Sequence, residues 1–245
     1  MDVPENEIVP LILAGGRGTR IAHLYPDLPK PAIPVMGRPF LAWLLLQLHG
    51  AGFSRAVVSA GYLAEKLRSE TVRWVPKGMN IEWVEEGSPL GTGGGAAFAA
   101  RAVRECGIEP KGWLVMNGDS YLAGGWAGRL KKSGAGEMTV VAREMEDTGR
   151  YGRLETDASD RLVSFSEKKE GGAGLINAGI YLIPDGWLRE IAANVASSME
   201  LDLIPNWLRD GRVVRLVRSA GSFLDVGTPE SLREAEEFIR RNVEL

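Results

Sequence analysis

The sequence predicts a three-layer α/β fold with a mainly parallel sheet, followed by a small antiparallel β subdomain. Apolar strand-like runs alternate with helix-like segments in the first half of the chain. From residue 137 onward the runs become shorter and richer in β-branched residues, which is typical of antiparallel strands. At 245 residues the chain can bury one large core but falls short of two full domains, so we expect a single domain over residues 1–245.

The first half alternates between strand and helix. Strands are expected at residues 9–13, 56–59 and 113–116, and a helix at 39–49. That helix has Pro39 near its start, and its core face is formed by Leu41, Leu44, Leu45 and Leu48. The order strand, helix, strand predicts βαβ units, and these units place the strands parallel.

The second half predicts a separate set of strands. Antiparallel strands are expected at 138–142, 161–165, 176–183 and 212–217. A closing helix begins after Thr228 and has one apolar face, formed by Leu232, Ala235, Phe238 and Ile239. These patterns divide the chain into residues 8–136, residues 137–228 and a C-terminal helix over 229–245.

Composition excludes several classes of function. The net charge of −3 gives no electrostatic reason to expect nucleic acid or an anionic membrane as partner. One cysteine, Cys106, excludes an internal disulfide, and two histidines, His23 and His49, are too few for a zinc cluster. Because the N-terminus is acidic and no apolar run is long enough to cross a membrane, we expect a cytoplasmic protein.

A glycine loop follows the first strand. Gly15, Gly16 and Gly18 allow a tight turn that presents backbone N–H groups to phosphate oxygens, and Arg20 and Lys30 add positive charge. On these residues alone, a plain glycine turn with solvated cations is equally consistent. Two other phosphate loops are excluded, because Gly18 is followed by Thr19-Arg20 instead of Lys-Ser/Thr, and because the third small residue of a dinucleotide fingerprint is missing.

A second glycine run, residues 91–95, joins the acidic turn at Glu86 to an alanine-rich helix. It is consistent with a flexible helix start. It is equally consistent with a surface against which a flat base lies, with Glu86 or backbone carbonyls contacting the edge of that base.

Two aspartates follow apolar runs. Asp119 ends residues 113–119 and Asp225 ends residues 223–225, so both are expected at the carboxyl ends of strands, where α/β sheets bind ligands. Each could cap a turn; together they could share a Mg²⁺ ion, which prefers oxygen ligands. The pair Glu167-Lys168 follows a predicted strand, where most such pairs are solvated turns, and Asn177 and Gly179 open the next strand.

Residues 13–31 closely resemble the signature of sugar-1-phosphate nucleotidyltransferases, and similar segments recur in the expected order as far as Pro229. The resemblance implies a Rossmann-like fold of the nucleotide-diphospho-sugar transferase type. No hexapeptide repeat follows the last predicted helix, so the left-handed β-helix of some relatives is expected to be absent.

The resemblance also implies site residues, which fall into four sets. The nucleotide-binding set is Leu13, Ala14, Gly15, Gly16, Gly18, Thr19, Glu86, Pro89, Gly91, Thr92, Gly93, Asn117 and Gly118. The sugar-binding set is Gly152, Glu167, Lys168, Asn177, Gly179 and Glu200. The catalytic cations are Arg20, Lys30 and Lys168, and the Mg²⁺ ligands are Asp119 and Asp225.

The segment from Pro89 to Gly93 resembles the motif of guanylyltransferases that act on mannose-type sugar phosphates. This implies GTP and a sugar 1-phosphate as substrates, with D-glycero-α-D-manno-heptose 1-phosphate as the first expectation. Mannose-1-phosphate guanylyltransferase and a thymidylyl-, uridylyl- or cytidylyltransferase are the alternatives, followed by a non-catalytic sensor of nucleotide sugars. Whether the protein forms a homo-oligomer is left open.

Overall fold

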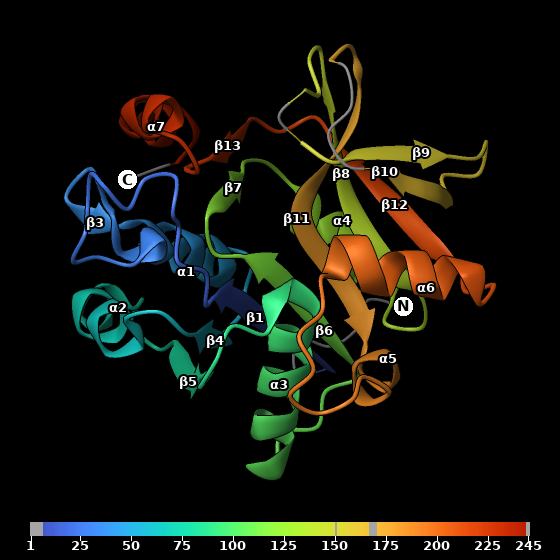
Figure 1. Cartoon of the computed structure of the whole chain (residues 1–245), viewed down its shortest axis with the longest axis horizontal. Coiled ribbons are helices and arrows are strands. Elements are labelled where there is room, and N and C mark those ends of the chain that lie inside the picture. Colours follow the sequence, from blue (N-terminus) through green and yellow to red (C-terminus); the bar gives the residue numbers. More distant parts are fainter. Residues whose placement is uncertain (1–6, 150, 167–170, 244–245) are drawn as a thin grey trace.

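The computed structural model describes residues 7–149, 151–166 and 171–243, and its centre is one nine-stranded mixed sheet (Figure 1). The nine strands are β1 (Ile8–Ala14), β4 (Arg55–Ala60), β5 (Asn80–Glu85), β6 (Gly112–Asn117), β8 (Met138–Met145), β9 (Arg153–Thr156), β10 (Leu162–Ser166), β11 (Gly174–Pro184) and β12 (Val214–Ser219). Their order is β10-β9-β11-β6-β1-β4-β5, and β8 pairs with β11 and carries β12 on its other edge.

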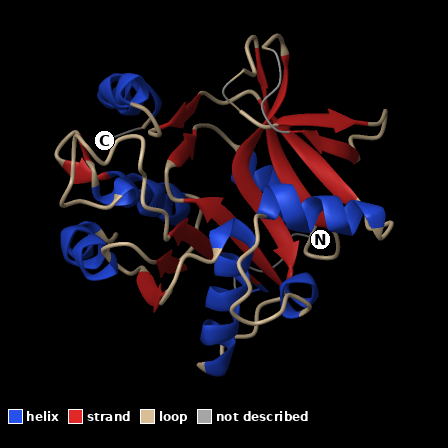
Figure 2. Cartoon of the chain, viewed as in Figure 1, coloured by secondary structure: helices blue, strands red, loops and turns tan. Residues whose placement is uncertain are grey.

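Helices and small ladders complete the fold (Figure 2). The α-helices are α1 (Phe40–Gly50), α2 (Ala64–Thr71), α3 (Gly91–Glu105), α4 (Trp126–Ser133), α5 (Asp185–Arg189), α6 (Ile204–Arg209) and α7 (Pro229–Asn242). Single helical turns are η2 (Lys30–Ala32), η3 (Val72–Trp74) and η4 (Met199–Leu203). Two-residue and three-residue strands form two further ladders, β2 (Pro34–Val35) with β3 (Arg38–Pro39) and β7 (Ser120–Leu122) with β13 (Phe223–Asp225).

The sheet is buried on both faces. Along β1, Ile8 and Ile12 face a core shared with α1, α2, α4 and α7, whereas Val9 and Leu11 face a core shared with α3, α5 and α6. Strands covered on both faces are apolar at every position, which is why the runs in this half of the sequence are continuous. The expected three-layer α/β architecture is confirmed. None of the described helices is both long and apolar enough to cross a membrane.

Strand directions confirm one expectation and correct another. β1 pairs parallel with β4 and β6, and β4 pairs parallel with β5, as the βαβ pattern predicts. The second half was expected to be antiparallel throughout, and this is wrong for β12, which pairs parallel with β8. The reason is that β8 already occupies one edge of β11. β12 therefore adds to the far edge of β8, and both run opposite to β11. Because β11 also pairs with β6, the second half continues the same sheet.

Asp185 anchors the amino edge of the sheet to α3. Its carboxylate accepts hydrogen bonds from Trp113 Nε1 at 2.7 Å, Arg104 Nη1 at 2.6 Å and Arg189 Nε at 2.5 Å. Burial is the largest single effect on this carboxyl and would raise its pKa. The donors from Trp113 and Arg189 and the charge of Arg104 outweigh it, so the pKa of Asp185 lies below 3.8.

We expect Asp185→Asn to lower the free energy of unfolding at pH 7 by about 2 kcal/mol, since bonds to a charged partner contribute about 1.5–3 kcal/mol. A carboxyl group whose pKa is lower in the folded state stabilises the protein at pH values above its unfolded-state pKa. This contribution to stability is lost as the pH falls through the folded-state pKa. The difference from the parent should therefore shrink below pH 3.8. Urea unfolding at a series of pH values measures both effects.

The control is Glu109→Gln. Glu109 is 69 % exposed and its ion pair with Arg189 spans 4.0 Å, so its loss should change stability by less than about 0.5 kcal/mol. Equal losses from the two substitutions would contradict the anchoring role of Asp185.

Candidate active site

The carboxyl ends of β1 and β6 meet at one edge of the sheet. Leu13 is in register with Asn117, and Gly118 N–H donates to the Leu13 carbonyl at 2.8 Å. The glycine loop after β1 and Asp119 after β6 therefore begin side by side. This is the edge at which open α/β sheets bind ligands.

A cluster of opposite charges lies at this edge. Lys30 Nζ donates to Asp119 Oδ2 at 2.5 Å and lies 3.5 Å from Asp225 Oδ1. Gly227 lies against the cluster: a Cβ at this position would be 3.2 Å from Lys30 Nζ and 3.1 Å from Arg20 Nη2. Two carboxylates and two cations thus converge from four segments of the chain.

Backbone pairing holds the two aspartates together. β13 pairs with β7 so that Asp225 is in register with Ser120, and Val226 N–H donates to the Asp119 carbonyl at 3.0 Å. Lys30 reaches them from the helical turn η2 and is 7 % exposed. Gly18 has a φ of +58° and packs on Lys30: a Cβ added at Gly18 would lie 2.9 Å from the Cβ of Lys30. The glycine loop therefore helps to hold the Lys30 side chain in place, in addition to forming its own turn.

Three adjoining cavities surround the cluster, and Asp119 lines all of them. The glycine-loop cavity, of about 260 Å³, is lined by Leu13, Ala14, Gly16, Gly18, Thr19, Arg20, Lys30, Pro31, Gly118, Asp119 and Gly227. The Glu86 cavity, also about 260 Å³, is lined by Leu13, Gly15, Gly16, Glu86, Pro89, Leu90, Gly91, Thr92, Asn117 and Asp119. The Asn177 cavity, about 320 Å³, is lined by Arg20, Asn117, Asp119, Ser120, Tyr151, Gly152, Phe165, Asn177, Gly179, Ser198, Glu200, Leu201, Phe223 and Asp225.

Glu86 is a buried acid in the wall of its cavity. It is 8 % exposed, and it accepts hydrogen bonds from Ser59 Oγ at 2.8 Å and Leu90 N–H at 3.3 Å. Its Oε1 would lie 2.9 Å from a Cβ at Gly15 and 2.8 Å from one at Gly95. Glycine at these two positions therefore leaves room for the carboxylate between the first loop and α3.

Glu200 and Asn177 meet at a buried tyrosine. Tyr181 Oη donates to Glu200 Oε1 at 2.6 Å and accepts from Asn177 Nδ2 at 2.5 Å. Burial, and then the neighbouring Glu200 carboxylate, raise the pKa of Tyr181 well above 10.0. The phenol consequently remains a neutral donor.

The second glycine run packs against the loop that leads to Glu200. Gly93 and Gly94 donate their N–H groups to the Ser197 carbonyl at 2.9 and 3.1 Å. A Cβ at Gly91 would lie 2.6 Å from that carbonyl oxygen, and one at Gly94 would overlap the Val195 carbonyl oxygen. Gly93 and Gly94 therefore allow close approach of a distant loop, while Gly91 and Thr92 of the same run line the Glu86 cavity.

The expected site residues therefore distribute over the three cavities, with three exceptions. Gly93 is buried against Leu203 and Ser197 instead of lining the Glu86 cavity. Glu167 and Lys168 lie outside the described residues. Thr92 is not an exception, because it lines the Glu86 cavity, but its hydroxyl also donates to Glu200 Oε2 at 2.7 Å.

Sequence reasoning missed Ser59 and Tyr181. Tyr181 stands four residues after Asn177 on a predicted strand, a spacing that places both side chains on the same face of a regular strand, and this was the available signal. In the structure the pairing of β11 with β8 shifts register between the two residues, and their hydrogen bond joins them across this irregularity. Ser59 offered none, because its partner Glu86 is 27 residues away on another element.

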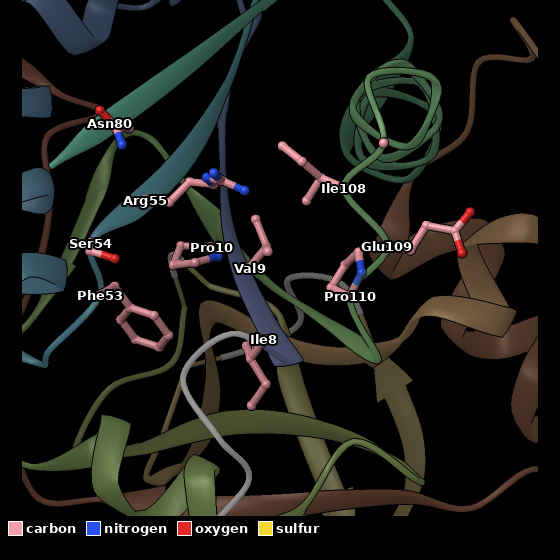
Figure 3. Close-up of a pocket in the computed structure, with 11 residues that line it drawn as sticks. Ile8, Val9, Pro10, Phe53, Ser54, Arg55, Asn80, Ile108, Glu109 and Pro110 are labelled. Atoms are coloured by element: carbon pink, nitrogen blue, oxygen red, sulfur yellow. The ribbon is translucent and has the colours of Figure 1, made fainter.

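A further cavity lies at the amino ends of the parallel strands, away from this site (Figure 3). It has a volume of about 390 Å³ and is lined by the first residues of β1, β4 and β5 and by the loop before β6. Arg55 and Glu109 are the charged side chains in its lining. It has no paired carboxylates, so we do not place the reaction there.

The residues present fit a hard divalent cation. Asp225 Oδ1 is buried and accepts no hydrogen bond within the described residues, while a cationic ammonium already lies beside it. No cluster of three acidic, histidine or cysteine side chains is found within the described part of the chain. Asp119 and Asp225 would therefore supply two ligands, and phosphate and water oxygens the others.

Comparison with known proteins agrees with this geometry. The nucleotidyl transferase family model matches residues 9–242. The chain belongs to the nucleotidyl transferase family. This nucleotidyl transferase is 30 % identical over 220 residues to a D-glycero-α-D-manno-heptose 1-phosphate guanylyltransferase of Campylobacter jejuni, with 90 % of this chain and 95 % of the relative covered.

Two further relatives extend the comparison. The nucleotidyl transferase is 32 % identical over 246 residues to a mannose-1-phosphate guanylyltransferase of Mycobacterium tuberculosis; 98 % of this chain is aligned, but it spans only 65 % of that relative's length. The crystal structure of HddC from Yersinia pseudotuberculosis superposes with a TM-score of 0.82 at 30 % identity, covering 93 % of this chain and 97 % of HddC. HddC has also been solved in complex with GMP-PN.

We expect Gly94→Ala to lower the free energy of unfolding by about 1–3 kcal/mol, because its Cβ would overlap the Val195 carbonyl oxygen and force a backbone shift. The midpoint of urea unfolding measures the loss. Gly128→Ala in α4 is the matched control, since it adds a Cβ that meets no atom within 4 Å. The control should gain about 0.5–1 kcal/mol from helix propensity, and a similar gain at Gly94 would contradict the packing role.

Proposed function

We propose that the protein is a sugar-1-phosphate nucleotidyltransferase that joins the nucleotide of GTP to a mannose-type sugar 1-phosphate and releases pyrophosphate. The observation that carries this proposal is the charge cluster of Lys30, Asp119, Asp225 and Arg20 where three cavities adjoin. A site for two polyanions needs cations at the junction and separate spaces for base, phosphates and sugar.

Catalysis in this proposal is positioning and charge stabilisation. A phosphate monoester has a second pKa of about 6, so the sugar phosphate oxygen is already a nucleophile at neutral pH and needs no general base. Lys30 would steady the α-phosphate under in-line attack, and Arg20 would offset charge on the departing pyrophosphate. Lys168, outside the described residues, would neutralise the sugar phosphate.

The glycine loop and Asn117–Gly118 would orient the nucleotide phosphates with backbone N–H groups, and Asn177 and Glu200 would contact sugar hydroxyls. Asp119 and Asp225 would hold Mg²⁺, which, when bound, neutralises charge on phosphate oxygens. The proposal includes a cytoplasmic location, in keeping with a chain that has a single cysteine.

Two sugars are candidates. D-glycero-α-D-manno-heptose 1-phosphate is favoured because the chain covers 95 % of the Campylobacter jejuni relative that carries its name. Mannose 1-phosphate is the alternative, supported by the Mycobacterium tuberculosis relative, of which the chain covers 65 %. Magnesium-dependent pyrophosphate release from each of the five nucleoside triphosphates, paired with heptose, mannose and glucose 1-phosphates, tests the proposal. Turnover with GTP and a mannose-type sugar supports it; silence across the panel from folded protein contradicts it.

We expect Asp119→Asn and Asp225→Asn each to lower kcat by at least about 10²–10³, the usual cost of one electrostatic contact to the transition state. Pyrophosphate release at saturating Mg²⁺ gives kcat, and circular dichroism establishes that the fold is kept. Asp210→Asn, at an exposed position after α6, is the control and should leave kcat unchanged. Turnover near the parent's in either site variant would remove the metal assignment.

Base choice is tested at Glu86. Guanine offers N1–H and N2–H₂ donors to a buried carboxylate, whereas adenine presents an acceptor at N1. We expect Glu86→Gln to lower kcat/KM for GTP by roughly 10–100-fold, the loss of one hydrogen bond to a charged group, with the fold intact. Glu85→Gln, next to it but on β5 and exposed, is the control. An unchanged preference for GTP over ATP in Glu86→Gln would assign base choice to backbone carbonyls instead.

A further inference from the structure

Tyr181 joins two side chains in the wall of the Asn177 cavity, Asn177 and Glu200, without being among the described residues that line it. It is fully buried in β11, beneath the Asn177 cavity. Its strand is held on both sides, because Tyr181 is in register with Val115 on β6 and with Val140 on β8. The phenol oxygen therefore has a fixed place in the sheet, and its two hydrogen-bond partners are the side chains proposed to contact the sugar.

The Glu200 carboxylate is nearly saturated. Oε1 accepts from Tyr181 at 2.6 Å, and Oε2 accepts from Thr92 at 2.7 Å and Ser198 at 2.9 Å. A carboxylate has about four acceptor positions, so three donors leave about one for a ligand. That position is on Oε1, which among the described residues accepts from the Tyr181 hydroxyl alone, and Glu200 lines the Asn177 cavity.

The other two donors do not replace Tyr181. Thr92 is itself held, because its hydroxyl accepts from Met199 N–H at 2.7 Å. Ser198 caps the turn η4 by accepting from the N–H groups of Glu200 and Leu201. Both hold Oε2, whereas the Tyr181 hydroxyl holds Oε1. Tyr181 is thus the donor at the oxygen that keeps an acceptor position for a ligand.

We propose that Tyr181 is a positioning residue for sugar recognition: its hydroxyl orients the Glu200 carboxylate and the Asn177 amide toward the sugar 1-phosphate. The inference rests on the proposed function and names a residue that acts through two others. A carboxylate oxygen that is held in place favours a sugar with a hydroxyl that can donate to it. With a sugar that lacks this hydroxyl, the buried oxygen would stay unpaired, which costs binding free energy.

The test is steady-state kinetics of Tyr181→Phe with GTP and the sugar 1-phosphate that gives turnover in the panel above. We expect KM for the sugar phosphate to rise about tenfold, the equivalent of about 1.4 kcal/mol, while KM for GTP stays within about twofold. Tyr121→Phe is the matched control: Tyr121 is also buried, and it packs edge-on against Phe238 with ring centroids 6.0 Å apart. Both KM values should stay at the parent's in that variant.

A double-mutant cycle separates positioning from general loss of stability. In a Glu200→Ala background, Tyr181→Phe should raise KM for the sugar phosphate by less than about threefold, because the carboxylate is gone and the Asn177 amide is the partner that remains to be oriented. A tenfold additional rise in that background, or a parent-like KM in the single variant, overturns the inference and leaves the proposed function standing. Silence of the parent enzyme across the whole panel overturns the proposed function and this inference with it.

Discussion

The parallel pairing of β1 with β6 is the constraint on which the rest of the site depends. Because the two strands run side by side in register, they end together. The segment that follows β1 therefore begins next to the segment that follows β6. Asp119 meets Lys30 across 89 positions of sequence for this reason. The small β7–β13 ladder is antiparallel, and it adds Asp225 from the far end of the chain by placing the last residue of β13 opposite the first residue of β7.

Electrostatics explains why such a cluster is stable before any substrate arrives. Lys30 is buried, and a buried ammonium is tolerated only when it is paired. Asp119 and Asp225 supply that pairing at 2.5 and 3.5 Å. The same carboxylates suit a divalent cation and the same ammonium suits a phosphate, so substrate binding would exchange partners inside a set of charges that is already assembled. Little reorganisation of the protein would then be required during reaction.

The local sequence pattern was sufficient to predict much of this structure. Continuous apolar runs followed by Gly15 or Asp119 identified strand ends, and the rule that parallel strands end at one edge places such residues together. The local sequence pattern was insufficient where a feature of the structure is caused by a residue far away in the sequence. Gly94 is explained by Val195, about a hundred residues later, and the direction of β12 by the edge that β8 occupies. Tyr181 belongs to an apolar strand, and its spacing of four residues from Asn177 was the one signal that set it apart from the core before its hydroxyl partners were known.

The second glycine run packs against the loop at 195–197, so these two walls of the site are structurally coupled and neither can change shape alone. Replacing this loop with the loop of a relative would also require the matching residues 91–94, because a side chain at Gly94 would force a backbone shift. Directed evolution of this scaffold toward new sugars is therefore best run on libraries that vary both segments together. Libraries that vary the loop alone would mostly sample destabilised variants.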